Sequence, residues 1–381
     1  MNKTVKVIIG GDVCIQPHFL TKELFLPDVI ALFLASDLNI VNLECPITSG
    51  TVNEKRIKTG PRLYSQAMII DQLKKISVNV VTLANNHILD SGKQALLNTL
   101  KLCHENEILT VGAGENQQEA SKPLLIEKDG NKIAIINFCE NEWSISLDDM
   151  PGANPLNIIE NVRAIEYAKK QSDFVILIIH TGHELYNLPS PRTVKLLRFF
   201  VECGANTIIC HHSHCFSGYE VYKNVPIFYG TGNLLFTRPS KSDLWYTGVA
   251  VQLDIQQDKL IKWKLIPLVN SKKEGTLNIG GEWIENEIER LTKIIQDPVA
   301  LKKNWKLFLE ERKEYYLQNL SVFNVFSNRY FRYVIRKLKI YRYTFSRRYL
   351  SYLLNFMRCE SHNDALSDIL FQVINNNEKC E

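Results

Sequence analysis

The sequence contains no hydrophobic run that could cross a membrane and no basic, apolar leader. No apolar stretch approaches the roughly 20 residues that a membrane-spanning helix needs. A β-like segment, Val5–Gly10, follows the first few residues directly, so we expect no signal peptide. The nine cysteines are odd in number and lack the spacing of a disulfide framework, which fits a reducing compartment. We therefore expect a cytoplasmic protein.

The chain also lacks internal repeats, low-complexity linkers and a strong overall charge. It has 381 residues, of which 45% are hydrophobic and 23% are charged, and its formal net charge is +4. These values are ordinary for a soluble globular protein. A chain of this length can hold one large domain and an addition to it.

Apolar β-like runs alternate with helical patterns up to about residue 268. The runs are rich in Val and Ile and are often apolar on both faces, which is typical of strands covered by helices. The predicted strands are Val5–Ile9, Leu38–Leu43, Val78–Leu83, Ile133–Phe138, Phe174–His180 and Asn206–Cys210, and antiparallel pairs are predicted for Tyr219–Tyr222 with Pro226–Tyr229 and for Gly248–Ile255 with Leu260–Ile266. The predicted helices are Gln94–Glu105, Ile158–Lys170 and Pro191–Cys203. We predict one α/β sandwich over residues 1–268 and a helical, basic and aromatic extension over residues 269–381.

Histidines crowd the loop after the last of the six single strands. His211, His212 and His214 fall within four positions, directly after an apolar run that ends at Cys210. Imidazole is the commonest protein metal ligand, and alternating histidines on a turn can reach two adjacent ions. The plainer alternative is a polar loop without a function.

Other side chains that bind metals recur where predicted strands end. Asp12, Glu44, Asn86 and His180 each follow or close a different strand. Taken singly, they have plainer interpretations: Asp12 can be a turn or cap residue, Glu44 a solvated strand end, and Asn86 part of a helix cap. Ligands of open α/β sheets gather at the carboxyl ends of strands. Together with the histidine loop, these strand ends therefore favour one metal site.

The ordered series of these motifs resembles the capsule synthesis proteins of the CapA type, also called poly-γ-glutamate biosynthesis proteins. This family looks like a branch of the calcineurin-like metallophosphoesterases, and the resemblance covers roughly residues 4–268. The matching motifs are Gly11-Asp12, Asn42-Leu43-Glu44, Leu83–Asp90, His180-x-Gly182-x-Glu184, His211–His214 and Gly230–Asn233. The resemblance implies a four-layer α-β-β-α metallophosphoesterase-like sandwich with a dinuclear metal centre.

The resemblance also implies a role for each matching residue. Two divalent ions, drawn from Mn²⁺, Zn²⁺, Fe and Mg²⁺, suit the carboxylate, amide and imidazole ligands. His87 would face the leaving oxygen of the substrate as a general acid or a charge-stabilising group. The implied metal ligands are Asp12 and His214 for the first ion, Asn86, His180 and His212 for the second, and Glu44 as the bridge.

The sequence departs from the superfamily pattern near the first ion. Cys14 stands where a histidine is usual, Thr181 replaces a common Trp, and Gln16-Pro17 replaces a frequent Arg. These departures predict a first metal site that is weak or that fills only with substrate bound. Cys14 can be a soft ligand or a small buried hydrophobic residue.

Further candidates surround the predicted centre. Glu184 and His211 are assigned to substrate binding, with Arg62 in the basic loop Asn53–Tyr64 as a contact for a phosphate or polyanion. A solvated loop is the alternative for that segment. Asp90 is interpreted either as a helix cap or as the carboxylate that orients His87.

One more candidate, Asn233, lies in the Gly-Thr-Gly-Asn motif. It is expected to close the floor of the site and contact substrate. Formation of a turn is the alternative.

The C-terminal region lacks acidic residues between Tyr315 and Cys359, where arginines and lysines alternate with many aromatic residues. Such a region can contact anionic lipid at the inner face of the membrane or a phosphorylated carrier. Alternatively, its aromatic residues pack onto the sandwich. Nucleic-acid binding ranks third, because no nucleic-acid motif supports it.

Two functions fit these patterns. The first is a metal-dependent hydrolase acting on a phosphoester, or on an anionic polymer, during the synthesis of a capsule or poly-γ-glutamate-type surface polymer. The second is a non-hydrolytic accessory protein of a membrane-associated polymer synthesis complex. Metal content and turnover of a phosphodiester would distinguish them.

Overall fold

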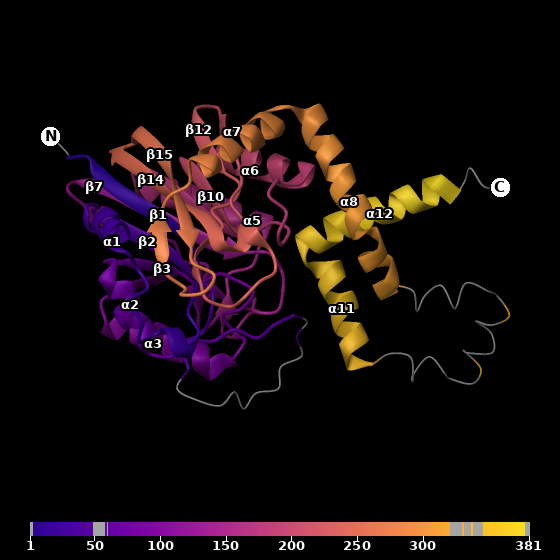
Figure 1. Ribbon diagram of the computed structural model, residues 1–381, viewed down its shortest axis with the longest axis horizontal. Helices are drawn as coiled ribbons and strands as arrows, with labels where there is room; N and C mark the ends of the chain where they lie inside the picture. Colours follow the sequence, from indigo (N-terminus) through magenta and orange to yellow (C-terminus); the bar gives the residue numbers. More distant parts are fainter. Residues whose placement is uncertain are drawn as a thin grey trace.

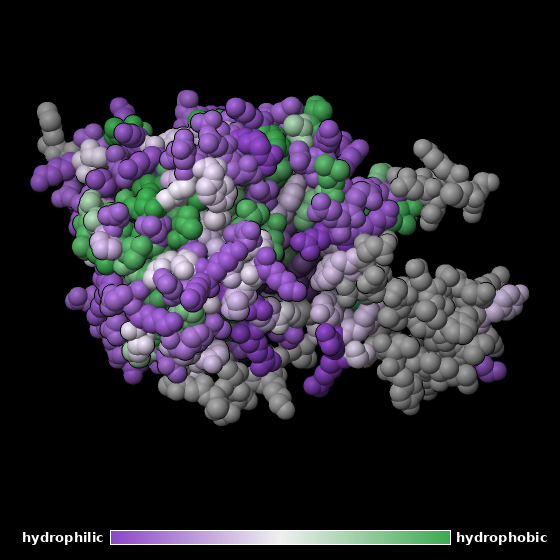
Figure 2. Space-filling model, in the orientation of Figure 1, coloured by the Kyte–Doolittle hydropathy of each residue, from purple (hydrophilic) through white to green (hydrophobic). Residues whose placement is uncertain are grey.

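The computed structural model of the protein describes residues 3–48, 58, 60–320, 330, 337 and 346–377. Two β-sheets form the centre of the molecule, and three further helices lie to one side of it, on the side opposite the N-terminus (Figure 1). The hydrophilic residues dominate the face shown in Figure 2, where apolar residues appear mainly over the sandwich.

The first sheet has a parallel half and an antiparallel half. Its strand order is β16-β15-β14-β1-β2-β3-β4, and β13 pairs with the end of β1. The pairs from β1 to β4 are parallel, and those from β1 to β16 are antiparallel. The strands are β1 (Val5–Cys14), β2 (Leu38–Leu43), β3 (Val80–Thr82), β4 (Leu109–Val111), β13 (Asn233–Phe236), β14 (Thr247–Gln256), β15 (Lys259–Asn270) and β16 (Leu277–Ile279).

The second sheet has a parallel centre and antiparallel edges. Its order is β11-β12-β10-β9-β7-β6, with parallel pairs from β12 to β7. The strands are β6 (Leu124–Lys128), β7 (Asn131–Cys139), β9 (Phe174–Thr181), β10 (Thr207–His212), β11 (Tyr219–Tyr222) and β12 (Val225–Phe228). A short pair, β5 (Ala113–Gly114) and β8 (Gly152–Ala153), lies apart, and a short helix, α4 (Gln117–Ala120), follows β5.

Three hydrophobic clusters define four layers. One cluster fills the space between the sheets and includes Ile9 and Ile40 from the first and Ile176 and Ile209 from the second. The others join each sheet to helices on its outer face. Those helices are α1 (Pro27–Leu34), α2 (Ile69–Lys75) and α3 (Lys93–Glu105) on the first sheet, and α5 (Ile158–Gln171), α6 (Pro191–Cys203) and α7 (Glu282–Gln296) on the second.

The predicted four-layer α-β-β-α sandwich is therefore confirmed. Strands covered on both faces become apolar throughout, and all eight residues of β9 are buried. The predicted boundary at residue 268 stays a prediction. Strand β16 extends the first sheet beyond that residue, and α7 packs on the second sheet.

In the described part of the C-terminal region, three helices pack on one another. They are α8 (Pro298–Leu320), α11 (Arg347–Arg358) and α12 (Glu360–Asn377). Trp305, Phe308, Tyr316, Phe356 and Ile369 form their shared core. An added helical region is thus confirmed, and aromatic packing explains part of its composition. No helix in the described ranges is both long and apolar enough to cross a bilayer.

Much of the basic stretch predicted to contact anionic surfaces lies outside the described residues, including Arg329, Arg332, Arg336, Lys339 and Arg342. Arg347 and Arg348, at the start of α11, are described and exposed. The contact with an anionic membrane therefore stays a prediction.

Candidate metal centre

The candidate metal centre lies where the carboxyl ends of strands from both sheets meet. Strand β1 carries Asp12, and Glu44 follows β2 directly, both in the first sheet. Strands β9 and β10 of the second sheet carry His180 and His212. The sequence motifs, which are spread over about 200 residues, thus meet through the topology of the two sheets.

The backbone turns sharply at the end of β10. His212 and His214 both have left-handed conformations, with φ values of 93° and 53°. Such conformations are uncommon for residues other than glycine. They break the strand at once, and the backbone N–H of His212 lies 3.3 Å from Asp12 Oδ2. The turn therefore brings the imidazoles of the histidine loop to the carboxylates of the first sheet.

Six side chains form two potential ligand groups that share Glu44. In one group, His180 Nε2 lies 3.5 Å from Glu44 Oε1 and 3.1 Å from His212 Nδ1. In the other group, His214 Nε2 lies 3.7 Å from Glu44 Oε1, and His214 Nδ1 lies 3.5 Å from Asp12 Oδ2. Asn86 Oδ1 joins the first group at 3.2 Å from His180 Nε2.

Glu44 shows why this cluster fits cations. Both of its carboxylate oxygens are buried and lack a hydrogen-bond donor, although a buried carboxylate without a partner is costly. Burial, and then the neighbouring charge of Asp12, raise the pKa of Glu44 well above its ordinary value. Burial and the surrounding imidazoles lower the pKa of His180 well below its ordinary value, so this histidine is in its neutral, metal-binding form. The donor set therefore fits divalent cations.

Neighbouring polar groups hold the potential ligands in place. Asn42 Nδ2 donates to Asp12 Oδ1 at 2.7 Å, and His214 Nδ1 lies 2.9 Å from Asn233 Oδ1. His211 Nδ1 lies 2.8 Å from Thr231 Oγ1 and 3.6 Å from Asp12 Oδ1. Such partners fix the tautomer and direction of a ligating imidazole.

Two residues that the sequence assigned to substrate binding thus lie behind the potential ligands. Asn233 and His211 are both buried, and neither is among the described residues that line the cavity at the site. Their positions favour a role in orienting His214 and Asp12 over direct contact with substrate. Sequence position alone did not distinguish these roles, because both residues lie in the same motifs and strands as the other candidates: His211 precedes His212 in β10, and Asn233 opens β13.

His87 is held by a buried charged pair. Its Nδ1 lies 2.6 Å from Asp90 Oδ2 and 2.8 Å from Lys58 Nζ, and Lys58 also pairs with Asp90. Burial, and then the charge of Lys58, lower the pKa of His87. Asp90 does not cap α3, whose N-cap residue is Gly92. Of the two interpretations of Asp90, the geometry thus favours the carboxylate that orients His87.

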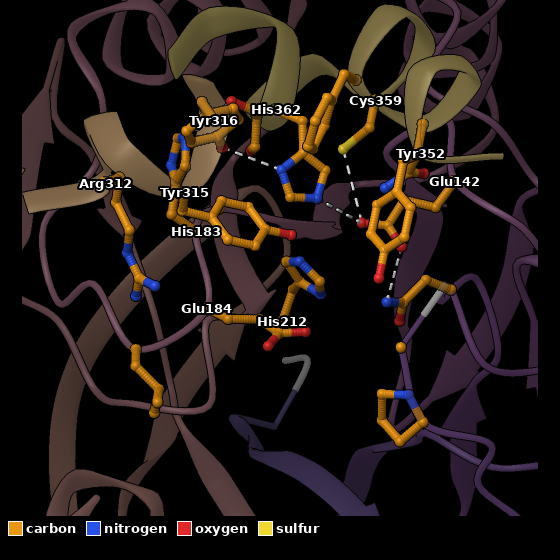
Figure 3. A pocket seen from close by; sticks show the side chains of 18 of the residues that line it. Glu142, His183, Glu184, His212, Arg312, Tyr315, Tyr316, Tyr352, Cys359 and His362 are labelled. Atoms are coloured by element: carbon orange, nitrogen blue, oxygen red, sulfur yellow. Dashed lines mark hydrogen bonds and ion pairs between the residues drawn. The ribbon is translucent and has the colours of Figure 1, made fainter. Parts of the chain in front are cut away.

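A cavity of about 330 Å³ opens over the centre (Figure 3). Asn86, His87 and His212 reach it from the sandwich, together with Glu142 and Glu184. The C-terminal helices form its opposite wall, which we call the roof, with Arg312, Tyr315, Tyr352, Phe356, Cys359 and His362.

The remaining predicted substrate contacts are placed differently. Glu184 is exposed at the cavity. Burial would raise its pKa, but the imidazoles of His214 and His212 outweigh that effect and lower it. Arg62 is exposed and lines a smaller neighbouring cavity with Asp90 and Arg358. It is not among the described residues that line the main cavity.

Sequence reasoning missed Glu142 and the whole roof. Glu142 Oε2 accepts a hydrogen bond from Asn86 Nδ2 at 3.0 Å. A sequence signal for Glu142 was present: Glu140 and Glu142 come just after the end of β7, and other candidate residues likewise lie at or after the ends of strands. The roof had no comparable local signal. His183, beside Glu184, is buried, and its Nε2 contacts the backbone oxygen of Ser361 at 2.8 Å.

The fold and the site define a four-layer α/β protein with clustered potential metal ligands at its strand ends. Residues 6–238 match the bacterial capsule synthesis protein family PGA_cap. The chain belongs to this family.

Individual relatives agree with the family match. The chain is 30% identical over 208 residues to the capsule biosynthesis protein CapA of Bacillus anthracis, a match that covers 53% of this chain and 51% of that protein. It is 26% identical over 281 residues to a "Probable polyglutamine synthesis accessory protein" of Mycobacterium tuberculosis, with coverages of 68% and 73%. The chain thus spans about half the length of the CapA relative. A solved structure of a phosphatase from Mycoplasma pneumoniae aligns with a TM-score of 0.46 and 17% identity, covering 72% of this chain and 97% of that chain.

Proposed function

We propose that this chain is a metal-dependent hydrolase that cleaves a phosphoester in the synthesis of a capsule or poly-γ-glutamate-type surface polymer. The carrying observation is Glu44: both of its buried oxygens lack a hydrogen-bond donor, and its side chain belongs to two potential ligand groups. Asn86 and His212, which belong to one of these groups, line the cavity. The family supports the biological setting, and the site geometry supports the chemistry.

The residues of the centre divide into binding and proton-transferring groups. Asp12, Glu44 and His214 would hold one divalent ion, and Glu44, Asn86, His180 and His212 the other. When bound, two such ions supply a deprotonated water as the nucleophile and neutralise charge on the phosphoryl oxygens. The new bond joins the water oxygen to phosphorus, and the bond from phosphorus to the leaving oxygen breaks.

His87 is the group placed to protonate the leaving oxygen. Its ring lines the cavity, and Asp90 and Lys58 hold its Nδ1 side. The opposite nitrogen, Nε2, is therefore the one available to substrate. Fixing one nitrogen of a histidine in this way sets which nitrogen donates a proton.

The cavity favours a small or terminal phosphoester as substrate. Its volume of about 330 Å³ lies at the lower end of the range for small-molecule sites, about 300–1,000 Å³. Tyr315 and Tyr352 enclose it from the roof, and Arg312 lies beside them (Figure 3). An anionic group that enters end-on would meet Arg312 on one side and the metal centre on the other.

The direct test is metal content together with turnover. The purified protein, reconstituted with Mn²⁺ or Zn²⁺, should bind two ions, the ion at Asp12 and His214 more weakly, and should hydrolyse a generic aryl phosphodiester. Chelation should abolish turnover, and the addition of metal should restore it. Turnover that persists unchanged in the fully chelated protein would contradict the proposal, as would an absence of bound metal.

Arg312 offers a sharper test of the substrate contact. We expect Arg312→Gln to raise KM for an anionic aryl phosphoester by roughly tenfold, because a hydrogen bond to a charged group contributes about 1.5–3 kcal/mol. The value of kcat should change little, since Arg312 lies across the cavity from the ligands. Arg163→Gln on the exposed face of α5 is the matched control. Equal KM values in all three proteins would show that Arg312 does not bind substrate.

The departures from the superfamily pattern beside Asp12, at the proposed first metal ion, favour a second function. Cys14 replaces the usual histidine there, and it lies buried beside Cys45 rather than among the ligand groups. A relative is named as an accessory protein of polymer synthesis. A chain that binds one ion or none and turns over no phosphoester would therefore act as a non-hydrolytic accessory protein.

A further inference from the structure

A second, separate cluster of metal-binding side chains lies where the roof meets the sandwich. Glu142 follows β7, Cys359 follows the last residue of α11, and His362 lies in the first turn of α12. Cys359 Sγ lies 3.6 Å from Glu142 Oε1, and His362 Nε2 lies 3.9 Å from the same oxygen. One ligand atom from each residue falls within 4.8 Å of the others. Figure 3 shows the three side chains pointing toward one another at the cavity wall.

These distances are close to those of ligands around one ion. Zinc binds sulfur at about 2.3 Å and nitrogen or oxygen at about 2.0–2.2 Å. Ligand atoms at tetrahedral angles around it therefore lie about 3.3–3.8 Å apart. The separations from Glu142 Oε1 need little change to reach that range. A thiol, an imidazole and a carboxylate together also suit zinc better than Mg²⁺ or Ca²⁺, which prefer oxygen.

Neighbouring groups already orient the three side chains. His362 Nδ1 lies 3.1 Å from the hydroxyl of Tyr316, so its Nε2 is turned toward Glu142. Glu142 Oε2 accepts from Asn86 Nδ2, which leaves Oε1 to face Cys359 and His362. Cys359 is fully buried. Partners of this kind raise metal affinity, because they fix the ligands before the ion binds.

Glu140, the other buried acid beside Cys359, is occupied differently. Its Oε1 accepts from the hydroxyls of Thr181 at 2.6 Å and Ser361 at 2.7 Å. Its Oε2 accepts from the backbone N–H of Ser361 at 3.2 Å and lies 3.4 Å from Cys359 Sγ. Glu140 is therefore satisfied by several protein donors and attaches α12 to the sandwich. Glu142 is the acid with one oxygen, Oε1, that faces both Cys359 and His362.

We propose that Glu142, Cys359 and His362 form a binding site for one thiophilic divalent cation of the Zn²⁺ type. All three residues line the cavity, so the fourth position of a tetrahedral ion would face it. Binding converts the Cys359 thiol to a thiolate and releases its proton to solvent. The site uses none of the six residues assigned to the dinuclear centre, and it joins the sandwich to the C-terminal helices.

Cobalt substitution tests this site directly, because a cysteine thiolate bound to Co²⁺ gives a charge-transfer absorption in the near ultraviolet. The six proposed ligands of the dinuclear centre include no cysteine. Titration of the metal-free protein with Co²⁺ should therefore produce a thiolate band whose final intensity corresponds to one Co²⁺–thiolate bond per chain, whatever cobalt the dinuclear centre also binds. Cys359→Ser, a nearly isosteric change, should abolish the band, and His362→Gln should weaken Co²⁺ binding at least tenfold.

Two control variants separate this site from the dinuclear centre. Cys14→Ala removes the buried cysteine that stands two residues after Asp12 and should leave the band intact. His212→Ala should lower the total metal content by disrupting the dinuclear centre but should also leave the band. A band lost in Cys14→Ala and kept in Cys359→Ser would overturn the proposal, as would the absence of any thiolate band in the wild-type protein.

Hydrogen exchange provides a readout that does not depend on absorption or activity. Because the ion would join Glu142 to α11 and α12, Zn²⁺ should slow exchange in residues 346–377 of the wild-type protein. The same addition to Cys359→Ser should not slow it. Equal protection in both proteins would show that the three residues form only a hydrogen-bonded contact, and it would overturn the proposal.

Discussion

Replacement of His212 or Asn86 by alanine is expected to remove bound metal and activity together, whereas His87→Ala should lose activity alone. His212 and Asn86 lie within 3.2 Å of His180 Nε2, inside one ligand group. His87 lies beside that group and contacts Asp90 and Lys58 instead. Loss of a general acid lowers turnover by about 10²–10⁴-fold, so His87→Ala should retain two ions and little turnover.

Elemental analysis and turnover of a phosphodiester on the same preparations measure this difference. An aryl substrate with a very acidic leaving group should partly restore the turnover of His87→Ala, since that leaving oxygen needs no proton. It should not restore the turnover of His212→Ala. Equal loss of metal in all three variants would contradict the division of roles and would make His87 a further ligand.

A second large effect is expected at Glu44. Glu44→Gln should abolish tight binding of both ions, because one side chain serves both ligand groups. The same variant should make the metal-free protein more stable at neutral pH. A buried polar group without a partner costs about 1–3 kcal/mol, and more when it is charged. A neutral amide at this position avoids most of the cost of burying the charge.

The raised pKa of Glu44 also predicts how the stability of the metal-free protein changes with pH. In the metal-free protein, the pKa of folded Glu44 lies well above its ordinary value of 4.5, so the folded state holds this proton more tightly than the unfolded state. The stabilisation by this proton is full below the unfolded pKa and is lost as pH rises through the folded pKa. The chelated wild-type protein should therefore lose stability over that rise.

Thermal unfolding of chelated wild-type protein and Glu44→Gln at several pH values tests this prediction. The stability of Glu44→Gln should not depend on titration at this position. The excess of its stability over that of the wild-type protein should therefore grow as pH rises. A wild-type protein that is more stable than the variant at neutral pH, with chelator present, would contradict the account of Glu44 as an unpartnered buried carboxylate.

The sequence predicted the parallel strands well because their composition and their motifs point to the same structure. Strand β2 has the predicted bounds, Leu38–Leu43, and among the helices α6 has the predicted bounds, Pro191–Cys203. The ligand motifs also predicted which strand ends meet, since Asp12, Glu44 and His180 come together across two sheets. The resemblance supplied the order of the motifs, and the topology supplied their convergence.

The rest of the site depends on contacts between residues far apart in the chain. Cys359 and His362 lie more than 200 positions from Glu142, and no periodic pattern connects them. The sequence also does not show whether a side chain is buried behind a site or exposed to its cavity. Asn233 opens β13 within a motif that the sequence assigned to the site, yet it lies behind His214 and not at the cavity.

The two walls of the cavity come from different parts of the chain. The floor lies within residues 6–238, which match the family, whereas Arg312, Tyr352 and the rest of the roof come from beyond that region. Chemistry and selectivity can therefore diverge separately: a relative with the same floor and a different C-terminal segment would keep the reaction but accept another substrate. Exchange of C-terminal segments between such relatives would then transfer substrate preference without altering the catalytic residues.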